Sequence, residues 1–319
     1  MTAEQLRKIS VIDPISPAIE RVKVMLFTPF DLRKWFVIGF CAWLAYLGSG
    51  QGGSTFNFGR GFNQSGRQPF YEARNYVINN LSWLIPAAIV TVVLMIIIGV
   101  VLIWLSSRGQ FMFLHCVAQN KAEVKVPWHK YRQQANSLFL FRIVVGIVSF
   151  VFFALFIGVI VFFIILSRGH THTNIPGIFT LILIFLLLLI AVPVGIAFTL
   201  LLKFTHDFVV PIMYLRACTC LEAWRELLTI LSVNKLRFTL YILFQIVIAM
   251  AIGGILMAAM CITCCCAACI LSIPYIGTVL LLPLLIFKRA YSLCYFRQFG
   301  PSFDVFSPEI VQPDLLQGT

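Results

Sequence analysis

Long uninterrupted apolar runs dominate the chain and determine its predicted elements. We expect six of them to cross a membrane as helices. Their expected bounds are 35–47, 81–105, 143–166, 175–202, 238–260 and 273–287. Runs this uniformly apolar can satisfy their backbone hydrogen bonds internally as helices, whereas barrel strands would alternate apolar and polar positions. The pattern therefore predicts an all-α, polytopic integral membrane protein with six transmembrane helices in three hairpins.

Polar segments between the runs give the expected organisation of the chain. We expect a cytoplasmic N-terminal amphipathic segment, a transmembrane domain and a cytoplasmic C-terminal tail. Their bounds are 1–34, 35–290 and 291–319, and the transmembrane domain includes an outer loop at 48–80 and cytoplasmic interfacial segments at 106–142 and 203–237. The outer loop is rich in Gly, Asn, Gln and Ser and should be flexible, because it cannot bury enough apolar surface to fold alone.

Charge placement orients the expected helices. Only 11% of the residues are charged, against about 25% in an average soluble domain. With six crossings, 20 of the 24 Lys and Arg residues fall on the side that holds both termini. Lys and Arg accumulate on the cytoplasmic side of membrane proteins, so this distribution predicts cytoplasmic termini and retains the short first span.

Three of the expected spans begin in a similar way, which indicates an internal repeat of about 100 residues. The segments entering spans one, three and five place polar or basic residues directly before an aromatic-led apolar run. Upstream of each entry, apolar residues recur at helical spacing. They are Ile15, Ile19, Val22 and Leu26; Trp128, Tyr131, Ala135 and Leu138; and Ala223, Trp224, Leu227, Leu228 and Leu231. Such amphipathic helices can lie in the membrane interface or pack as ordinary caps on the bundle, and both alternatives remain open.

Three stretches of the sequence carry a resemblance to a known group of proteins. They read "FTPFDLRKWFVIGFCAWLAYLG", "HDFVVPIMYLRACTCLEAWRELL" and "LSIPYIGTVLLLPLLIFKRAYSLCYFRQFG". They resemble uncharacterised bacterial multi-pass proteins similar to the membrane domain of glycerophosphoryl diester phosphodiesterases and to related domains of unknown function. The resemblance implies a protein of the bacterial cytoplasmic (inner) membrane, and it supplies no catalytic residues.

The expected spans contain no ionisable side chain, and this limits the chemistry that the chain can perform at membrane depth. Ion-coupled transport usually needs such groups to bind or neutralise the moving charge. An adjacent pair, His206 and Asp207, follows the fourth span. It could act as an acid and base, but no nucleophile is apparent, and Asp207 could equally be an interfacial anchor or a helix cap. We therefore predict no catalytic residue and no cofactor.

Basic residues that flank the spans are candidates for contact with lipid headgroups. They are Arg33, Lys34, Lys130, Arg132, Arg225, Lys235, Arg237, Lys288 and Arg289. An anionic cytoplasmic leaflet would attract them, although the same residues could serve only to set topology. Because they are spread along membrane flanks rather than gathered on one soluble module, we expect membrane lipids as partners and no nucleic acid. A protein partner or a homo-oligomer is also expected.

The stretch "CITCCCAACI" (261–270) places five cysteines near the end of the fifth span. Cysteine spacing alone disfavours a metal site, because on an unbroken helix the ends of the face shared by Cys261, Cys265 and Cys269 lie about 12 Å apart. A site would need a helix break and the histidines of the outer loop. The candidate ligands are then His170, His172, Cys261, Cys264, Cys265 and Cys269. The alternative is that these cysteines simply pack as small apolar residues.

Together these features favour a non-catalytic membrane scaffold or accessory protein with a basic cytoplasmic interface. The absence of ionisable groups in the expected spans and the repeated amphipathic segments support this hypothesis. The alternative is a carrier or channel for an uncharged or amphipathic solute, which could bind its substrate through carbonyls at helix breaks.

Overall fold

Helices form all the regular secondary structure in the part of the chain that the structure describes. The computed structural model describes residues 9–47, 81–168, 175–263, 266–271 and 273–306. These residues divide into two compact units. Unit 1 takes the described residues within 1–17, 131–241 and 291–319, and unit 2 takes those within 18–130 and 242–290. The all-α prediction is confirmed for the described residues.

Among the described residues, four helical stretches are long and apolar enough to cross a membrane. They are Ser82–Gln119, Arg132–Phe163, Ile182–Arg216 and Lys235–Ile262. They belong to α5 (Leu81–Gln119), α7 (Arg132–Arg168), α8 (Ile175–Phe204) with its continuation, and α11 (Lys235–Ile262). Each helix runs past the apolar run that predicted it, so parts of the expected interfacial segments 106–142 and 203–237 are continuous with the long helices.

The first and sixth expected spans are not helices of crossing length. The first lies in α3 (Leu32–Ala45), whose 14 residues extend only about 21 Å against a hydrocarbon core of about 30 Å. The sixth is divided between α13 (Ile276–Leu280) and α14 (Leu282–Arg297). Tyr275 has a positive φ of 71° immediately before α13, a conformation that no helix continues through. A six-span arrangement is therefore not confirmed.

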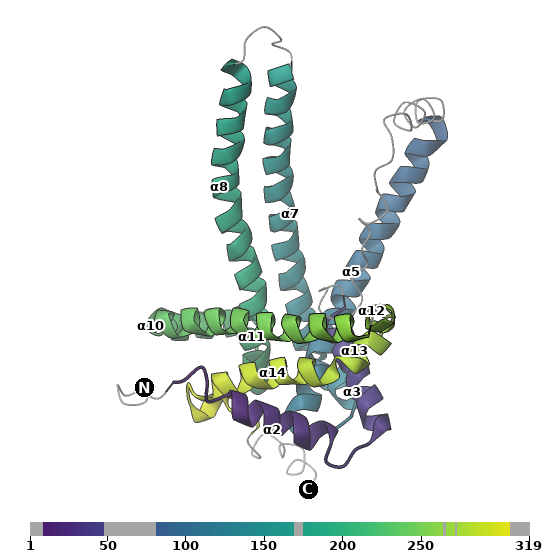
Figure 1. Cartoon of the computed structure of the whole chain (residues 1–319), viewed down its shortest axis with the longest axis vertical. Helices are drawn as coiled ribbons and strands as arrows, with labels where there is room; N and C mark the ends of the chain where they lie inside the picture. The colour runs from purple at the N-terminus through teal and green to yellow at the C-terminus, as the bar shows by residue number, and fades with distance from the viewer. Residues whose placement is uncertain (1–8, 48–80, 169–174, 264–265, 272, 307–319) are drawn as a thin grey trace. The chain divides into compact units, whose positions relative to one another are not determined.

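Unit 1 contains a pair of long apolar helices, α7 and α8, which lie side by side (Figure 1). A Cβ added at Gly195 of α8 would lie 3.5 Å from the Phe153 ring of α7, so the small residue admits the neighbouring aromatic side chain. After α8, the chain continues through a π-helix, η1 (Thr205–Val209), into α9 (Val210–Arg216) and α10 (Cys220–Val233). The start of α11 and the end of α14 complete the unit, together with the 3₁₀ turn η2 (Pro301–Phe303).

Unit 2 is built around close packing of α3 on the C-terminal third of α5. Every residue from Ser106 to Ala118 is buried. A Cβ added at Gly109 would lie 2.5 Å from backbone atoms of Leu44 and Ala45, so only glycine permits this approach. The Ser106 hydroxyl donates to the Ala45 carbonyl at 2.9 Å. These contacts join α3 to α5 without any strongly polar side chain.

Helix α2 (Ile15–Leu26) closes the end of α5 in unit 2. The Arg21 guanidinium donates to the carbonyls of Val117 and Ala118, at 2.9 and 2.5 Å. The last carbonyls of a helix have no partner within the helix, and a cation complements their partial negative charge. Arg21 therefore satisfies two of these carbonyls.

The three predicted amphipathic segments have different outcomes. Helix α2 and α10 form, but the segment from Trp128 to Leu138 is divided between α6 (Lys125–Lys130) and α7. In unit 2 the Trp128 ring faces the Arg108 guanidinium, which lies 4.7 Å from the Trp128 ring centroid and 4.6 Å from that of Trp104. A cation over an indole face is attracted by the ring quadrupole, so this contact fixes α6 against α5.

We expect Gly109→Ala to destabilise the protein and Gly99→Ala not to do so. The methyl group at position 109 would collide with α3 backbone, and overpacking of this kind costs about 1–3 kcal/mol. At Gly99 an added Cβ meets no described atom within 4 Å, and Ala is the better helix former. Thermal unfolding of the detergent-solubilised variants checks this, and equal midpoints for the two variants would contradict the close α3–α5 approach.

Candidate functional site

The strongest concentration of acid and base groups in unit 1 lies where α8 widens into the π-helix η1. Pro211 follows Asp207 by four positions, and a proline ring clashes with the carbonyl four residues before it and cannot donate to that carbonyl. A wider turn relieves this clash, and single π-turns inside helices occur frequently at functional sites. The Thr205 hydroxyl donates to the Leu201 carbonyl at 2.7 Å. The sequence thus accounts for a wide turn at "THDFV".

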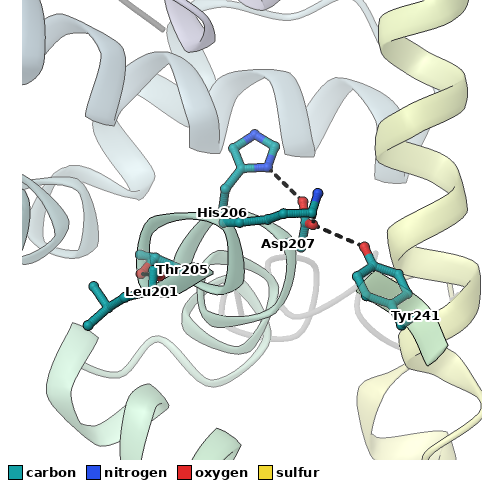
Figure 2. A network of polar contacts seen from close by, with 6 residues as sticks. Leu201, Thr205, His206, Asp207 and Tyr241 are labelled. Carbon is teal, nitrogen blue, oxygen red and sulfur yellow. Dashed lines mark hydrogen bonds and ion pairs between the residues drawn. The ribbon is translucent and has the colours of Figure 1, made fainter. Parts of the chain in front are cut away.

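Asp207 is the centre of a polar network drawn in Figure 2. Its side chain is buried and accepts from three donors. Lys203 Nζ lies 2.9 Å from Oδ2, Tyr241 Oη lies 3.0 Å from the same oxygen, and His206 Nδ1 lies 3.0 Å from Oδ1. A carboxylate can only accept, so His206 carries a hydrogen on Nδ1. Both oxygens of the buried carboxylate are therefore satisfied.

Aromatic side chains surround the Tyr241 side of this network. The Phe208 ring centroid lies 5.2 Å from that of Phe238, and Tyr241 stacks on Tyr295 with centroids 4.7 Å apart. The Tyr295 hydroxyl donates to the Arg237 carbonyl at 3.0 Å, and burial raises the pKa of Tyr295. An apolar surround lowers the local dielectric, which strengthens each hydrogen bond to the carboxylate.

This arrangement joins three helical segments of unit 1. Asp207 joins η1 to α11 through Tyr241 and to α8 through Lys203. The Thr205 hydroxyl, the nearest alcohol in sequence, is bonded to a carbonyl of its own helix. Asp207 as a helix cap is wrong, because the residue lies inside the continuous helical path from α8 to α9.

The observed helix length also changes the expectation that no ionisable side chain lies within a membrane span. The expected fourth span ends at Leu202, but the membrane-length helical stretch extends to Arg216 and therefore includes Lys203, His206 and Asp207. Two signals in the sequence point to the site: Lys203 precedes Asp207 by one helical turn, and Pro211 follows it by one turn. Tyr241 has no such signal, because only folding brings it to Asp207.

The predicted headgroup contacts occupy different environments. Exposed side chains are found at Arg33, Lys130, Arg132, Arg225 and Lys235, and half-buried ones at Lys34, Arg237 and Lys288. Two of the half-buried groups have internal partners: Lys34 donates to Asn120 Oδ1 at 2.9 Å, and Arg237 donates to the Ile9 carbonyl at 2.6 Å.

Arg289 departs from the prediction. Its side chain is 1% exposed, inside unit 2, and in this position it does not face a headgroup. The sequence placed it beside Lys288 at a membrane flank. Because helix α14 continues to Arg297, packing rather than the end of a helix decides where this guanidinium lies.

The cysteine-rich stretch contains the helix break that a metal site would require. Helix α11 ends at Ile262 and α12 begins at Cys266 (Cys266–Leu271). Cys261 and Cys269 are exposed, while His170, His172, Cys264 and Cys265 lie outside the described residues. Within the described ranges, no three His, Cys, Asp or Glu side chains form a group that could hold a metal ion. The metal site therefore stays a prediction.

Two other cysteines lie close together although the sequence separates them. In unit 2, Cys41 of α3 and Cys116 of α5 are buried with their sulfur atoms 3.9 Å apart. The Cys116 thiol also lies 3.6 Å from the Glu123 carbonyl. The expected topology assigned the two residues to a span and to the cytoplasmic side. Packing of α3 on α5 brings them together.

Comparison with known proteins identifies a family relationship. The sequence model of a family described as a family of unknown function, DUF7544, matches residues 9–296. No curated protein and no solved structure matches the chain. The resemblance to phosphodiesterase membrane domains therefore remains a prediction.

Replacing Tyr241 with Phe should destabilise the protein more than replacing Tyr295 with Phe. Tyr241 donates to a carboxylate and Tyr295 to a neutral carbonyl. A hydrogen bond to a charged group contributes about 1.5–3 kcal/mol, and one between neutral groups about 0.5–1.5 kcal/mol. The two unfolding midpoints, measured in the same detergent, test the ranking. A smaller loss for Tyr241→Phe would show that the network does not hold η1 to α11.

Proposed function

Because the chain belongs to DUF7544, a family of unknown function matched over residues 9–296, we propose a function from its own residues: a non-catalytic scaffold or accessory protein of a bacterial cytoplasmic membrane. The protein would act by holding its helices and their exposed surfaces in place for other membrane components.

The Asp207 network is the observation that carries this proposal. Asp207 accepts from Lys203, His206 and Tyr241 at 2.9 to 3.0 Å, so both oxygens of the buried carboxylate are bound by donors of unit 1 itself. These contacts join α8, η1 and α11. This acid and base cluster therefore supports a structural role.

Cys220, at the start of α10, also supports a structural role rather than a catalytic one. The thiolate is the reactive form of cysteine, and burial in apolar surroundings disfavours it. Burial raises the pKa of Cys220, at the start of α10, to about 12. At neutral pH this thiol is protonated, so it is a poor nucleophile.

We propose that the chain crosses the membrane six times and that both termini are cytoplasmic. The support is the distribution of Lys and Arg. Four crossings, by α5, α7, α8 and α11 alone, would leave 13 of these residues on the side of the termini and 11 on the other, whereas six crossings leave 20 and 4. Only the second distribution follows the positive-inside rule. Segments 35–47 and 273–287 would then cross despite their short helices, with local thinning of the bilayer. Crossing by 35–47 also requires α3 to leave its contact with the end of α5, where Ser106 donates to the Ala45 carbonyl at 2.9 Å.

An epitope tag inserted after Gly52 distinguishes the two topologies. With six crossings, antibody should reach this tag in intact spheroplasts, because residues 48–80 would lie outside. A tag after Thr319 should become accessible only after lysis. If four helices cross, both tags lie on the same side, and equal accessibility before lysis would contradict the proposed topology.

Crosslinking with mass spectrometry of the native complex tests the scaffold function. We expect reproducible crosslinks from this chain to the same membrane protein, or to a second copy, in samples that retain lipid. Purification as a monomer with no co-purifying protein or lipid would overturn the proposal. Solute flux through vesicles reconstituted with the pure protein would instead support the alternative, a carrier or channel for an uncharged or amphipathic solute.

A further inference from the structure

Helix α10 exposes several apolar side chains in addition to those that it buries within unit 1. One face buries Cys220, Ala223 and Leu227. On the opposite side Leu221, Leu228 and Val233 remain 65%, 51% and 68% exposed. A surface helix of a soluble protein usually turns polar residues outward. Scattered exposed leucines need no explanation, but Leu221 and Leu228 lie two turns apart on one face of a single helix.

Contacts with α7 place α10 beside the start of an apolar stretch. The backbone N–H of Cys220 donates to Ser137 Oγ at 3.0 Å, and the Trp224 ring centroid lies 6.1 Å from that of Phe141. Beyond Arg142, the α7 sequence is free of charged residues from Ile143 to Leu166. In Figure 1, α10 runs across the direction of the α7 and α8 pair. If that pair crosses a bilayer, α10 lies near its surface.

Basic side chains accompany the exposed apolar ones. Arg225 is exposed and lies between Leu221 and Leu228 on the same face, and exposed Lys235 follows two residues after α10 ends. The acidic neighbours are engaged elsewhere. Glu226 pairs with Arg216 at 2.5 Å, and Glu222 accepts from the Thr219 backbone N–H at 2.9 Å in a capping box. The outward side of α10 therefore combines apolar and cationic groups with the exposed polar side chains of Glu222, Thr229 and Ser232.

We propose that α10 docks in the surface of an anionic bilayer. Leu221, Leu228 and Val233 enter the boundary between headgroups and acyl chains, and Arg225 and Lys235 lie at the phosphates. Helices with one apolar face and flanking cations bind membrane surfaces in this way. A protein partner could also cover leucines, but the adjacent apolar start of α7 favours lipid. The inference rests on the membrane location in the proposed function, and it does not require the scaffold partner.

Hydrogen exchange measured by mass spectrometry on the full chain in lipid nanodiscs tests this docking. Wild-type protein is compared in phosphatidylcholine alone and in a mixture with phosphatidylglycerol. Amides of α10 should exchange about 25-fold more slowly in the anionic discs, since Arg225 and Lys235 each favour the docked state at an anionic surface by a factor of about five. Exchange in peptides from η1 and α9 should be equal in both discs, because those residues are buried within unit 1.

Two double variants separate the contributions of charge and apolar surface. Arg225→Gln with Lys235→Gln should remove the difference between the two lipid compositions. Leu221→Ser with Leu228→Ser should speed α10 exchange in both. Lys121→Gln, at an exposed lysine of unit 2, is the matched control and should behave as wild type. Exchange in η1 and α9 shows whether each variant is folded.

The proposal is overturned if wild-type α10 exchanges equally in both lipids and the leucine variant matches wild type in folded protein. Crosslinks from α10 to a second protein in nanodiscs that hold both would also overturn it. If the crosslinking experiment detects no protein partner, the expected exchange results for α10 are unchanged. Failure of the docking and failure of the scaffold function are therefore distinguishable.

Discussion

A buried carboxylate must be matched by donors, and in unit 1 this requirement determines how three helical segments meet. Asp207 would be costly in apolar surroundings if its oxygens lacked partners. Lys203 comes from the preceding turn, His206 from the adjacent position and Tyr241 from α11. Once the carboxylate is satisfied, Phe208, Phe238 and the stacked tyrosines can pack around the same point. Polar satisfaction and apolar packing therefore depend on one side chain.

In unit 2, close backbone packing rather than a buried carboxylate determines how α3 and α5 meet. Helices α3 and α5 can approach closely because Gly109 has no side chain. The polar contacts between them involve a hydroxyl, a carbonyl and two thiols rather than an ion pair. Charged side chains lie outside this contact: Arg21 binds the last carbonyls of α5, and the Arg108 guanidinium lies over the rings of Trp104 and Trp128. Close backbone approach of this kind has little tolerance for added volume, which makes the α3–α5 contact specific without a buried charge.

The exposed surfaces of α10 connect the architecture to the proposed function. A helix that only capped unit 1 would need one apolar face, and α10 also exposes Leu221, Leu228 and Val233 beside the cations Arg225 and Lys235. The Asp207 network lies in the helical path that leads to α10 through α9. Rigid support at this point would keep α10 in a fixed orientation relative to α7, which is what docking on a bilayer surface requires.

Apolar patterning by itself determined the helical class and the positions of four membrane-length helices, because an uninterrupted apolar run in lipid has few other ways to satisfy its backbone. It also placed α2 and α10, through the helical recurrence of apolar residues. It could not show that α3 would pack against Gly109 of α5, that α14 would bury Arg289, or that Tyr241 would meet Asp207. Those outcomes depend on contacts between residues distant in the chain, and only the tertiary structure brings such residues together.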